Sequence, residues 1–238
     1  MEVRCAAIKK SAGVFSMAVG LLFSGGLDST ILLRQLLCDG QQVQPFYICA
    51  GLDWESMEIA AAKQIIQALR SPRLNSLVML QMPVRDLYAD HWSTTGNNVP
   101  GYGTTDEAVF LPGRNGLLVH KAALWCQLHG IERLALAVLS ANPFRDARVE
   151  FFQSLQQMFN AGMAPSIEIV CPFAHLTKRQ VIQQAFDCPL HLTFSCLAPS
   201  GSLHCGHCNK CAERRGALRE AGRTDHTTYA IDGKVCTK

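Results

Sequence analysis

A short apolar segment that runs into a paired-glycine turn constrains the fold of this chain more than any other feature. Residues 17–23 (MAVGLLF) form a nearly continuous apolar run, as expected of a strand buried on both faces of a parallel sheet. Residues 24–29 (SGGLDS) follow, and apolar residues at helical spacing then continue to Cys38. A strand, a tight turn and a helix in this order are typical of the opening of an α/β fold.

The same alternation continues along most of the 238 residues. Further strands are predicted at 43–49, 76–82, 133–139 and 167–171, although Pro45 is unfavourable inside a strand. Helices are predicted at 29–38, 55–69, 114–129, 146–161, 177–186 and 212–221, with a short additional strand at 191–194. We therefore expect an α/β fold built on a doubly wound, mainly parallel, five-stranded sheet.

Composition excludes several other classes of protein. Hydrophobic residues make up 48% and charged residues 17%, so the chain is neither disordered nor a coiled coil. A formal net charge of +3 is too small to indicate nucleic-acid binding by itself. The apolar run at 14–23 is about half the length of a membrane span and reaches the glycine turn, which predicts neither a membrane protein nor a signal peptide.

Residues 83–111 lack a clear period and are rich in Gly, Asn, Thr and Asp. Unstructured connections of this length are uncommon in compact domains unless they serve a function. We expect a lid or a substrate loop here.

The turn at 24–29 has the features of a phosphate site. Backbone N–H groups and the helix dipole at a strand-to-helix turn favour an anion, and paired glycines let phosphate oxygens approach the backbone. The string is neither a Walker A loop nor the G-x-G-x-x-G dinucleotide motif, because Asp28 stands near the helix start. An aspartate beside phosphates is expected where Mg²⁺ lies between them. The simpler alternative is a structural turn in which Asp28 or Ser29 caps the helix.

Four of the eleven cysteines are close together in the sequence, namely Cys196, Cys205, Cys208 and Cys211. Four thiolates close a tetrahedral structural Zn²⁺ site, which is our prediction. His204 or His207 could replace a thiol, and an iron–sulfur cluster could use the same four cysteines. A nucleic-acid-binding zinc ribbon is a further alternative that Arg214 and Arg215 alone support only weakly.

The remaining cysteines lie mostly in apolar segments, where a small buried hydrophobe is expected. They are Cys5, Cys38, Cys49, Cys126, Cys171, Cys188 and Cys236. This uneven distribution is unlike a disulfide framework and predicts a reducing, cytoplasmic location.

Four motifs together resemble the 7-cyano-7-deazaguanine synthase family. The string at 24–29 resembles the PP-loop of ATP pyrophosphatases, which cleave ATP between the α- and β-phosphates. Residues 112–115 (PGRN) and 176–178 (LTK) resemble two further family segments. The cysteine motif with Arg214 and Arg215 that follow it resembles the family's C-terminal part, so the likeness runs over most of residues 17–229.

The resemblance implies an adenine nucleotide alpha-hydrolase-like fold and an ATP-dependent enzyme that forms C–N bonds in queuosine biosynthesis. Family members convert 7-carboxy-7-deazaguanine and ammonia into the nitrile with ATP, Mg²⁺ and a structural Zn²⁺. The carboxylate is adenylated and amidated, and the amide is then adenylated and dehydrated. The implied catalytic residues are Asp28, Lys178 and Arg114, and the implied ATP-binding residues are Phe23, Ser24, Gly25, Gly26, Leu27, Asp28, Ser29 and Thr30. Arg114 starting a helix and Lys178 being solvated are the structural alternatives.

The chain departs from the family pattern where the substrate is expected. Residues 51–55 (GLDWE) stand in place of the family's Y-G-Q segment, and residues 142–151 (NPFRDARVEF) lack the leading Asp and Ser of another family motif. Candidate substrate-binding residues are Asn115, Phe144, Asp146, Arg148 and Asp53. Trp54 and Phe144 could stack on a purine-like ring or serve local packing.

These departures leave the final nucleophile open. An alternative is an offshoot of the family that joins the deazaguanine carboxylate to an amine of a partner protein, as in antiviral defence, with the exposed segment 97–105 as a docking surface. A catalytically silent, zinc-stabilised nucleotide-binding protein is a second alternative. We expect an ATP pyrophosphatase domain at 1–190, a zinc-binding region at 191–238 packed on it, and, from the resemblance, a homodimer.

Overall fold

The computed structural model describes residues 18–230. Five parallel strands form one sheet in the order β3-β2-β1-β4-β5. The strands are β1 (Ala18–Leu22), β2 (Gln42–Cys49), β3 (Val78–Gln81), β4 (Arg133–Ala135) and β5 (Glu168–Val170). The prediction of a five-stranded parallel α/β fold is confirmed.

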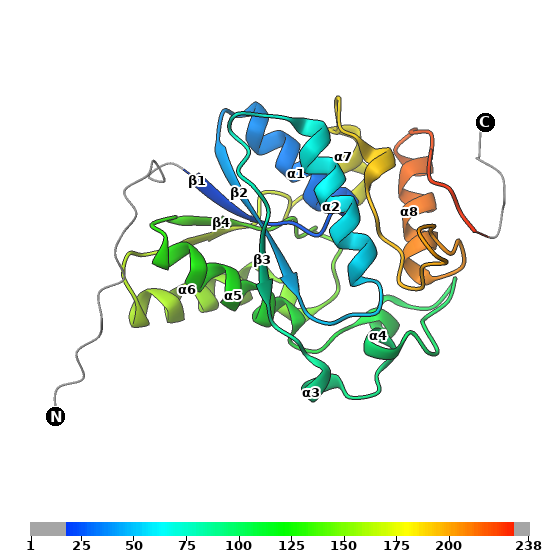
Figure 1. Ribbon diagram of the computed structural model, residues 1–238, viewed down its shortest axis with the longest axis horizontal. Coiled ribbons are helices and arrows are strands. Elements are labelled where there is room, and N and C mark those ends of the chain that lie inside the picture. Colours follow the sequence, from blue (N-terminus) through cyan, green and yellow to red (C-terminus); the bar gives the residue numbers. More distant parts are fainter. Residues whose placement is uncertain (1–17, 231–238) are drawn as a thin grey trace.

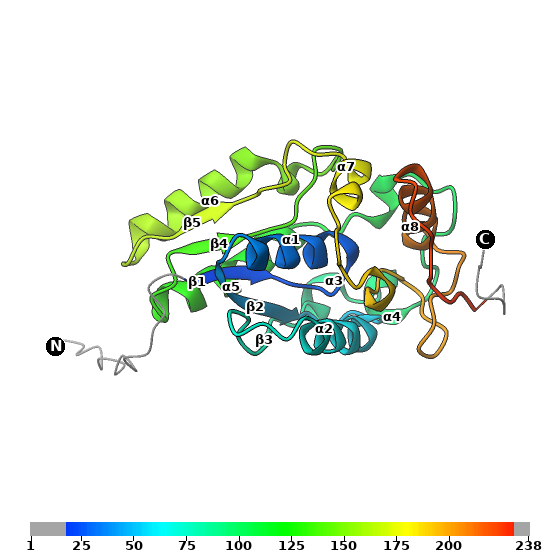
Figure 2. The same ribbon diagram turned by 90° about the horizontal axis from the view of Figure 1, so that it is seen from above.

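Helices cover both faces of the sheet (Figure 1 and Figure 2). On one face α1 (Leu27–Cys38) and α2 (Glu55–Leu69) pack with α7 (Lys178–Gln183) and α8 (Asn209–Glu220) around a shared apolar core. On the other face α5 (Arg114–Leu128) and α6 (Val149–Gly162) form a second core. The sheet is therefore doubly wound, as predicted. None of the helices within residues 18–230 combines the length and apolar character that crossing a bilayer requires.

Gly20 explains how closely α5 approaches the sheet. A Cβ at this position would lie 2.7 Å from Cys126 Sγ and 2.9 Å from the Phe46 ring. Pro45 is also accommodated, although it was unfavourable for a strand. Pairing of β2 with β3 begins at Phe46, so Pro45 needs no N–H to satisfy that neighbour.

Several element boundaries differ from the sequence predictions. β4 ends at Ala135 rather than at residue 139: Leu136 N still donates to Val170 O at 2.9 Å, but residues 137–139 diverge from the sheet, and residues 136–139 line a cavity. The strand predicted at 191–194 was wrong, since a short 3₁₀ helix (Leu190–Leu192) lies there. Cys38 was predicted to be buried but is exposed, while Cys5 and Cys236 lie outside the described residues.

The long connection at 83–111 contains short helices rather than a structureless loop. These are α3 (Arg85–Tyr88), α4 (Trp92–Thr95) and a 3₁₀ turn (Asp106–Val109), and a further 3₁₀ turn (Arg145–Ala147) precedes α6. The segment at 97–105 packs against the cysteine-rich loop: Tyr102 N donates to His207 O at 2.7 Å and Asn209 N to Pro100 O at 2.9 Å. Figure 1 shows this stretch beneath the loop that leads into α8. Most of its residues are exposed, as expected.

Candidate active site

A cavity of about 550 Å³ opens at the carboxyl ends of the strands. Strand order reverses between β1 and β4, and such switch points are the usual ligand sites of doubly wound sheets. Residues from the glycine turn, α5, the segment after β4, α7 and α8 all contribute to the walls. Among the polar or aromatic lining residues are Ser24, Asp28, Ser29, Tyr47, Trp54, Glu58, Asp106, Arg114, Asn115, Asn142, Phe144, Lys178, Lys210 and Glu213.

The glycine turn is held in shape by its neighbours. Gly25 has a φ of +74°, and a Cβ there would lie 2.8 Å from Ala62 N on α2. Gly25 O accepts a hydrogen bond from Phe194 N at 2.9 Å. Only glycine satisfies both the left-handed backbone and this close approach, because a side chain would collide with backbone atoms. The local sequence therefore fixes the turn against α2.

The turn presents the start of α1 to the cavity. Gly26 is the N-cap, and no side chain caps the helix. Neither Asp28 nor Ser29 acts as the structural cap that the simpler alternative required. Ser29 Oγ instead lies 3.3 Å from both Ser24 Oγ and Gly26 O. An uncapped helix start beside a cavity offers N–H groups and a partial positive charge to an anion.

Asp28 and Lys178 meet at the floor of this cavity. Lys178 Nζ donates to Asp28 Oδ2 at 2.6 Å, and Asp28 Oδ1 is buried without a hydrogen-bond partner in the described chain. Thr177 orients Lys178, since it caps α7 in a capping box with Gln180. Burial alone lowers the pKa of an ammonium, but Asp28 and Glu213 outweigh it and hold the pKa of Lys178 above its ordinary value. Lys178 is therefore a fixed positive charge.

Arg114 begins α5, where a cation is unfavourable for the helix dipole. Its Nε is buried and has no hydrogen-bond partner among the described residues. An unpaired guanidinium nitrogen beside a cavity costs free energy unless a ligand accepts from it. Arg114 thus has the properties of an anion-binding residue.

On the α2 side of the cavity, the half-buried Glu58 pairs with the buried Tyr47. The Tyr47 hydroxyl donates to Glu58 Oε2 at 2.8 Å. Burial raises the pKa of Glu58, while Arg114 and Tyr47 partly offset that effect. Burial, followed by the charge of Glu58, raises the pKa of Tyr47, which keeps the phenol a hydrogen-bond donor.

The five candidate substrate residues do not all face this cavity. Asn115 and Phe144 line it, and Phe144 also packs against Phe110 with ring centroids 4.8 Å apart. Asp146 is buried and accepts from Asn115 N at 3.3 Å, so it supports the start of α5. Asp53 and Arg148 are exposed and lie outside the lining.

Trp54 is 3% exposed, lines the cavity with part of its surface, and stacks on Trp92 with centroids 5.7 Å apart. Local packing therefore occupies much of its ring. Of the connection at 83–111, Asp106 alone contributes to the cavity wall.

The four predicted cysteines come together in a buried cluster. Their Sγ atoms all lie within 4.8 Å of one another, with Cys196–Cys208 and Cys205–Cys211 each at 3.9 Å. A tetrahedral zinc with Zn–S bonds of about 2.3 Å would separate its sulfurs by about 3.8 Å, which matches. Backbone N–H groups donate to Sγ of Cys196, Cys205 and Cys208 at 3.2 to 3.5 Å. The residues present thus fit a four-thiolate metal site.

Neither nearby histidine joins the candidate ligand group. His204 is buried and its Nε2 accepts from Ser195 N at 3.2 Å, whereas His207 is exposed. Arg214 is also buried, with Nη1 donating to Thr193 Oγ1 at 2.8 Å and Nε to Thr227 Oγ1 at 2.7 Å. A buried Arg214 ties α8 to its neighbours and is not available to a nucleic acid.

Several polar residues of the cavity were not singled out from the sequence, among them Tyr47, Glu58, Lys210 and Glu213. Lys210 and Glu213 are three residues apart on either side of Cys211, but the predicted helix began at residue 212, whereas α8 begins at Asn209. A helix that starts within the cysteine motif places both side chains on one face, because residues i and i+3 of a helix are neighbours. The spacing could therefore have identified this pair. Tyr47 and Glu58 left no such signal, because only the packing of α2 on β2 brings them together.

Fold and site together define a doubly wound α/β protein with a glycine turn beside a cavity and a four-cysteine cluster. The family model described as "Queuosine biosynthesis protein QueC" matches residues 18–222. The chain belongs to this QueC family.

Curated relatives agree with the family assignment. The 7-cyano-7-deazaguanine synthase 1 of Desulfitobacterium hafniense is 31% identical over 206 residues, covering 84% of this chain and 91% of the relative. The 7-cyano-7-deazaguanine synthase of Magnetococcus marinus is 31% identical over 227 residues, covering 90% and 97%. Among solved structures, the U34-tRNA thiolase NcsA of Methanococcus maripaludis superposes with a TM-score of 0.44 at 15% identity, covering 94% of this chain and 77% of that chain. A likeness this low carries no argument about the site.

Proposed function

We propose that the protein is an ATP-dependent enzyme that converts 7-carboxy-7-deazaguanine and ammonia into 7-cyano-7-deazaguanine. The observation that carries this proposal is the shared cavity: the glycine turn, Asp28, Lys178, Arg114 and Asn115 all line it. Relatives named 7-cyano-7-deazaguanine synthase, aligned over most of their length, support the choice of substrate.

In the first step a carboxylate oxygen of the substrate attacks the α-phosphorus of ATP, and the bond to the β-phosphate breaks. The glycine turn and the uncapped start of α1 would hold the phosphates, together with Ser24 and Ser29, whereas Thr30 is fully buried and lies outside the cavity lining. Lys178 and Arg114 would neutralise negative charge as pyrophosphate leaves. Mg²⁺ bound at Asp28 would stabilise charge on the departing pyrophosphate, and the unpartnered Asp28 Oδ1 fits such a role.

Ammonia then attacks the acyl adenylate, AMP leaves, and a proton is lost to give the amide. A second ATP adenylates the amide oxygen, and loss of AMP with the remaining N–H protons gives the nitrile. Asn115 and Phe144 would contact the heterocycle at the far wall of the cavity. The cysteine cluster is closed by four thiolates, so its Zn²⁺ would be structural.

The test is pyrophosphate release from ATP and Mg²⁺ with 7-carboxy-7-deazaguanine, with and without ammonia, while mass spectrometry follows the product. We expect release that depends on the carboxylate, and nitrile only with ammonia. The matched control is 7-deazaguanine without the carboxyl group, which cannot be adenylated in this way. Absence of release with the carboxylate would reject the proposal and favour a silent nucleotide-binding protein.

A second candidate keeps the adenylation and replaces ammonia by an amine of a partner protein. It is favoured by the exposed segment 97–105, in which Tyr102 is 74% exposed and which leads directly to Asp106 at the cavity wall. This enzyme would stop at the amide, so a stable mass increase on a co-purified protein would support it. The proposed homodimer and cytoplasmic location are checked separately, by light scattering and by cell fractionation.

A further inference from the structure

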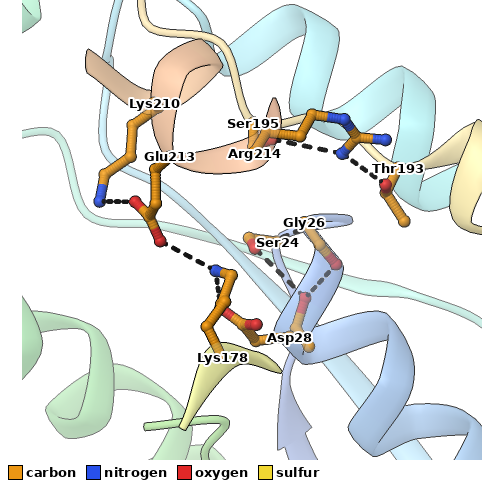
Figure 3. A network of polar contacts seen from close by, with 10 residues as sticks. Ser24, Gly26, Asp28, Lys178, Thr193, Ser195, Lys210, Glu213 and Arg214 are labelled. Atoms are coloured by element: carbon orange, nitrogen blue, oxygen red, sulfur yellow. Dashed lines mark hydrogen bonds and ion pairs between the residues drawn. The ribbon is translucent and has the colours of Figure 1, made fainter. Parts of the chain in front are cut away.

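Helix α8 supplies two charged side chains to the cavity that no motif requires. Lys210 and Glu213 lie on its first turns, on either side of Cys211. Both line the cavity that also contains the glycine turn. In Figure 3, Glu213 points toward Lys178, which meets Asp28, while Lys210 contacts the other side of the Glu213 carboxylate.

A chain of ion pairs connects the two helices. Lys210 Nζ lies 2.5 Å from Glu213 Oε2, and Lys178 Nζ lies 3.1 Å from Glu213 Oε1. Lys178 Nζ continues to Asp28 Oδ2 at 2.6 Å. Glu213 therefore holds one lysine with each of its oxygens, and a single carboxylate separates the two ammonium groups. A polyphosphate chain is long enough to contact two cations at that spacing.

A simple surface ion pair explains the arrangement less well. Isolated i, i+3 pairs contribute little and leave both side chains mobile. Here the side chains of Lys178 and Asp28 are only 23% and 22% exposed, and those of Lys210 and Glu213 are 35% and 36% exposed. Three helices, α1, α7 and α8, converge on the network, so the ammonium groups have restricted positions.

The backbone of α8 is also fixed at this point. Cys208 is the N-cap and Cys211 lies in the first turn, so two members of the cysteine cluster flank Lys210. Arg214, next to Glu213, is 2% exposed and donates to Thr193 and to Leu190 O. Thr193 precedes Phe194, whose N–H bonds to Gly25 O in the glycine turn. Hydrogen bonds through Arg214, Thr193 and Phe194 thus link the cysteine region to the glycine turn.

We propose that Lys210 binds a phosphate of ATP and that Glu213 is the positioning residue that holds Lys210 and Lys178 toward it. The inference rests on the proposed function, because it takes ATP as the ligand. Lysine binds phosphate as a point charge on a flexible stem, so its usefulness depends on being held in place. On this proposal the cysteine cluster also contributes to ATP binding, because it fixes the start of α8 and so places Lys210 at the ATP site.

The test is direct binding of α,β-methylene-ATP with Mg²⁺, measured by calorimetry on the full chain. This analogue cannot be cleaved at the α–β bond, so the measurement is independent of the carboxylate substrate and of turnover. We expect Lys210→Met to weaken binding about tenfold and Lys210→Arg to retain most of the affinity. The matched control is Lys63→Met, which removes the same charge from an exposed position on α2 outside the cavity.

Glu213→Gln separates positioning from plain electrostatics. Removing a negative charge that faces phosphate predicts tighter binding, whereas loss of positioning predicts weaker binding. We expect weaker binding, and we expect the effect of Lys210→Met to shrink to within about twofold in the Glu213→Gln background, because the two residues act as a unit. Bound metal and melting temperature are recorded for every variant and are expected to stay unchanged.

Equal affinities of the parent, Lys210→Met and Lys63→Met would overturn the role of Lys210. Tighter binding by Glu213→Gln, or additive effects in the double variant, would overturn the positioning role. Loss of bound metal in Lys210→Met together with failure of Lys210→Arg to recover affinity would assign the effect to the cysteine cluster instead. A parent protein that does not bind the analogue would reject the proposed function itself, and the inference with it.

Discussion

The glycine turn at 24–29 lies between a strand and a helix, whereas the four cysteines come from two loop positions and the start of α8. The turn keeps its shape through backbone contacts, such as Gly25 against Ala62 N and Phe194 N. The cluster keeps its shape through four buried thiols and the N–H groups that donate to them. Both regions border one cavity. The glycine turn forms its part of the wall from residues that are adjacent in the sequence, whereas the cysteine region depends on residues that tertiary folding brings together.

Substitutions in the two regions should therefore have different effects on the structure. A change of a side chain that the turn presents to the cavity, such as that of Asp28, alters a few atoms at the ligand and leaves the surrounding cores intact. A change in the cluster releases the start of α8, the loop at 204–208 and the segment at 100–104 together, since hydrogen bonds join them. Substitutions of these turn side chains should therefore mainly reduce activity, and substitutions in the cysteine cluster should mainly reduce stability.

The largest effect is expected from Asp28→Asn. Loss of the carboxylate removes the proposed Mg²⁺ ligand and the partner of Lys178, so substrate-dependent pyrophosphate release should fall about 10³-fold. The measurement is steady-state pyrophosphate release with a melting curve on the same sample. Asp39→Asn, at the exposed opposite end of α1, is the matched control and should retain full activity. Equal activity of the two variants would contradict the role given to Asp28.

Cys211→Ser should mainly reduce stability. A buried four-thiolate site that loses one ligand binds its metal poorly, and metal-binding free energy is folding free energy. We expect bound metal to fall well below one ion per chain and the free energy of unfolding to drop by more than about 4 kcal/mol. Elemental analysis and denaturant unfolding measure both. Cys38→Ser, at an exposed cysteine, is the control that should change neither.

Gly25→Ala tests the backbone argument for the turn. An alanine would adopt an unfavourable φ of +74° and place its Cβ 2.8 Å from Ala62 N, so we expect a loss of about 2 kcal/mol. Gly40→Ala provides the comparison, because Gly40 has a φ of +78° with no atom within 4 Å of the added Cβ. It should show only the conformational cost, about 1 kcal/mol. Equal losses in denaturant unfolding would mean that contact with α2 does not constrain the turn.

The two regions also differ in how far the sequence predicted them. The string at 24–29 predicted a strand-to-helix turn, and the structure has it, because paired glycines and flanking apolar runs are local features. The four cysteines were likewise identified from spacing. Glu58 and Tyr47 were not, since residues on α2 and β2 meet only through tertiary packing.

Asp53 and Arg148 show that the position of a residue in a motif does not by itself place its side chain in the cavity. Both were candidate substrate residues because they stand where the resemblance places substrate contacts, but sequence position does not determine which way a loop residue faces. The structure leaves both exposed and outside the cavity. Similarly, β4 was predicted four residues too long because residues 136–139 are apolar, but an apolar run can equally line a cavity, as these residues do beyond the end of the strand.

The smallest expected effect concerns Glu58, whose backbone O lies 3.1 Å from the Cβ position at Gly25. Burial raises the pKa of Glu58 above its ordinary value of 4.5. The folded chain therefore keeps this proton at pH values where the unfolded chain has lost it, so the residue costs stability as pH rises above 4.5. Glu58→Gln removes that cost, and its melting temperature relative to the parent should increase between about pH 4 and pH 7. Glu220→Gln, at an exposed site, should show no such trend. A flat difference for both variants would mean that folding does not raise the pKa of Glu58.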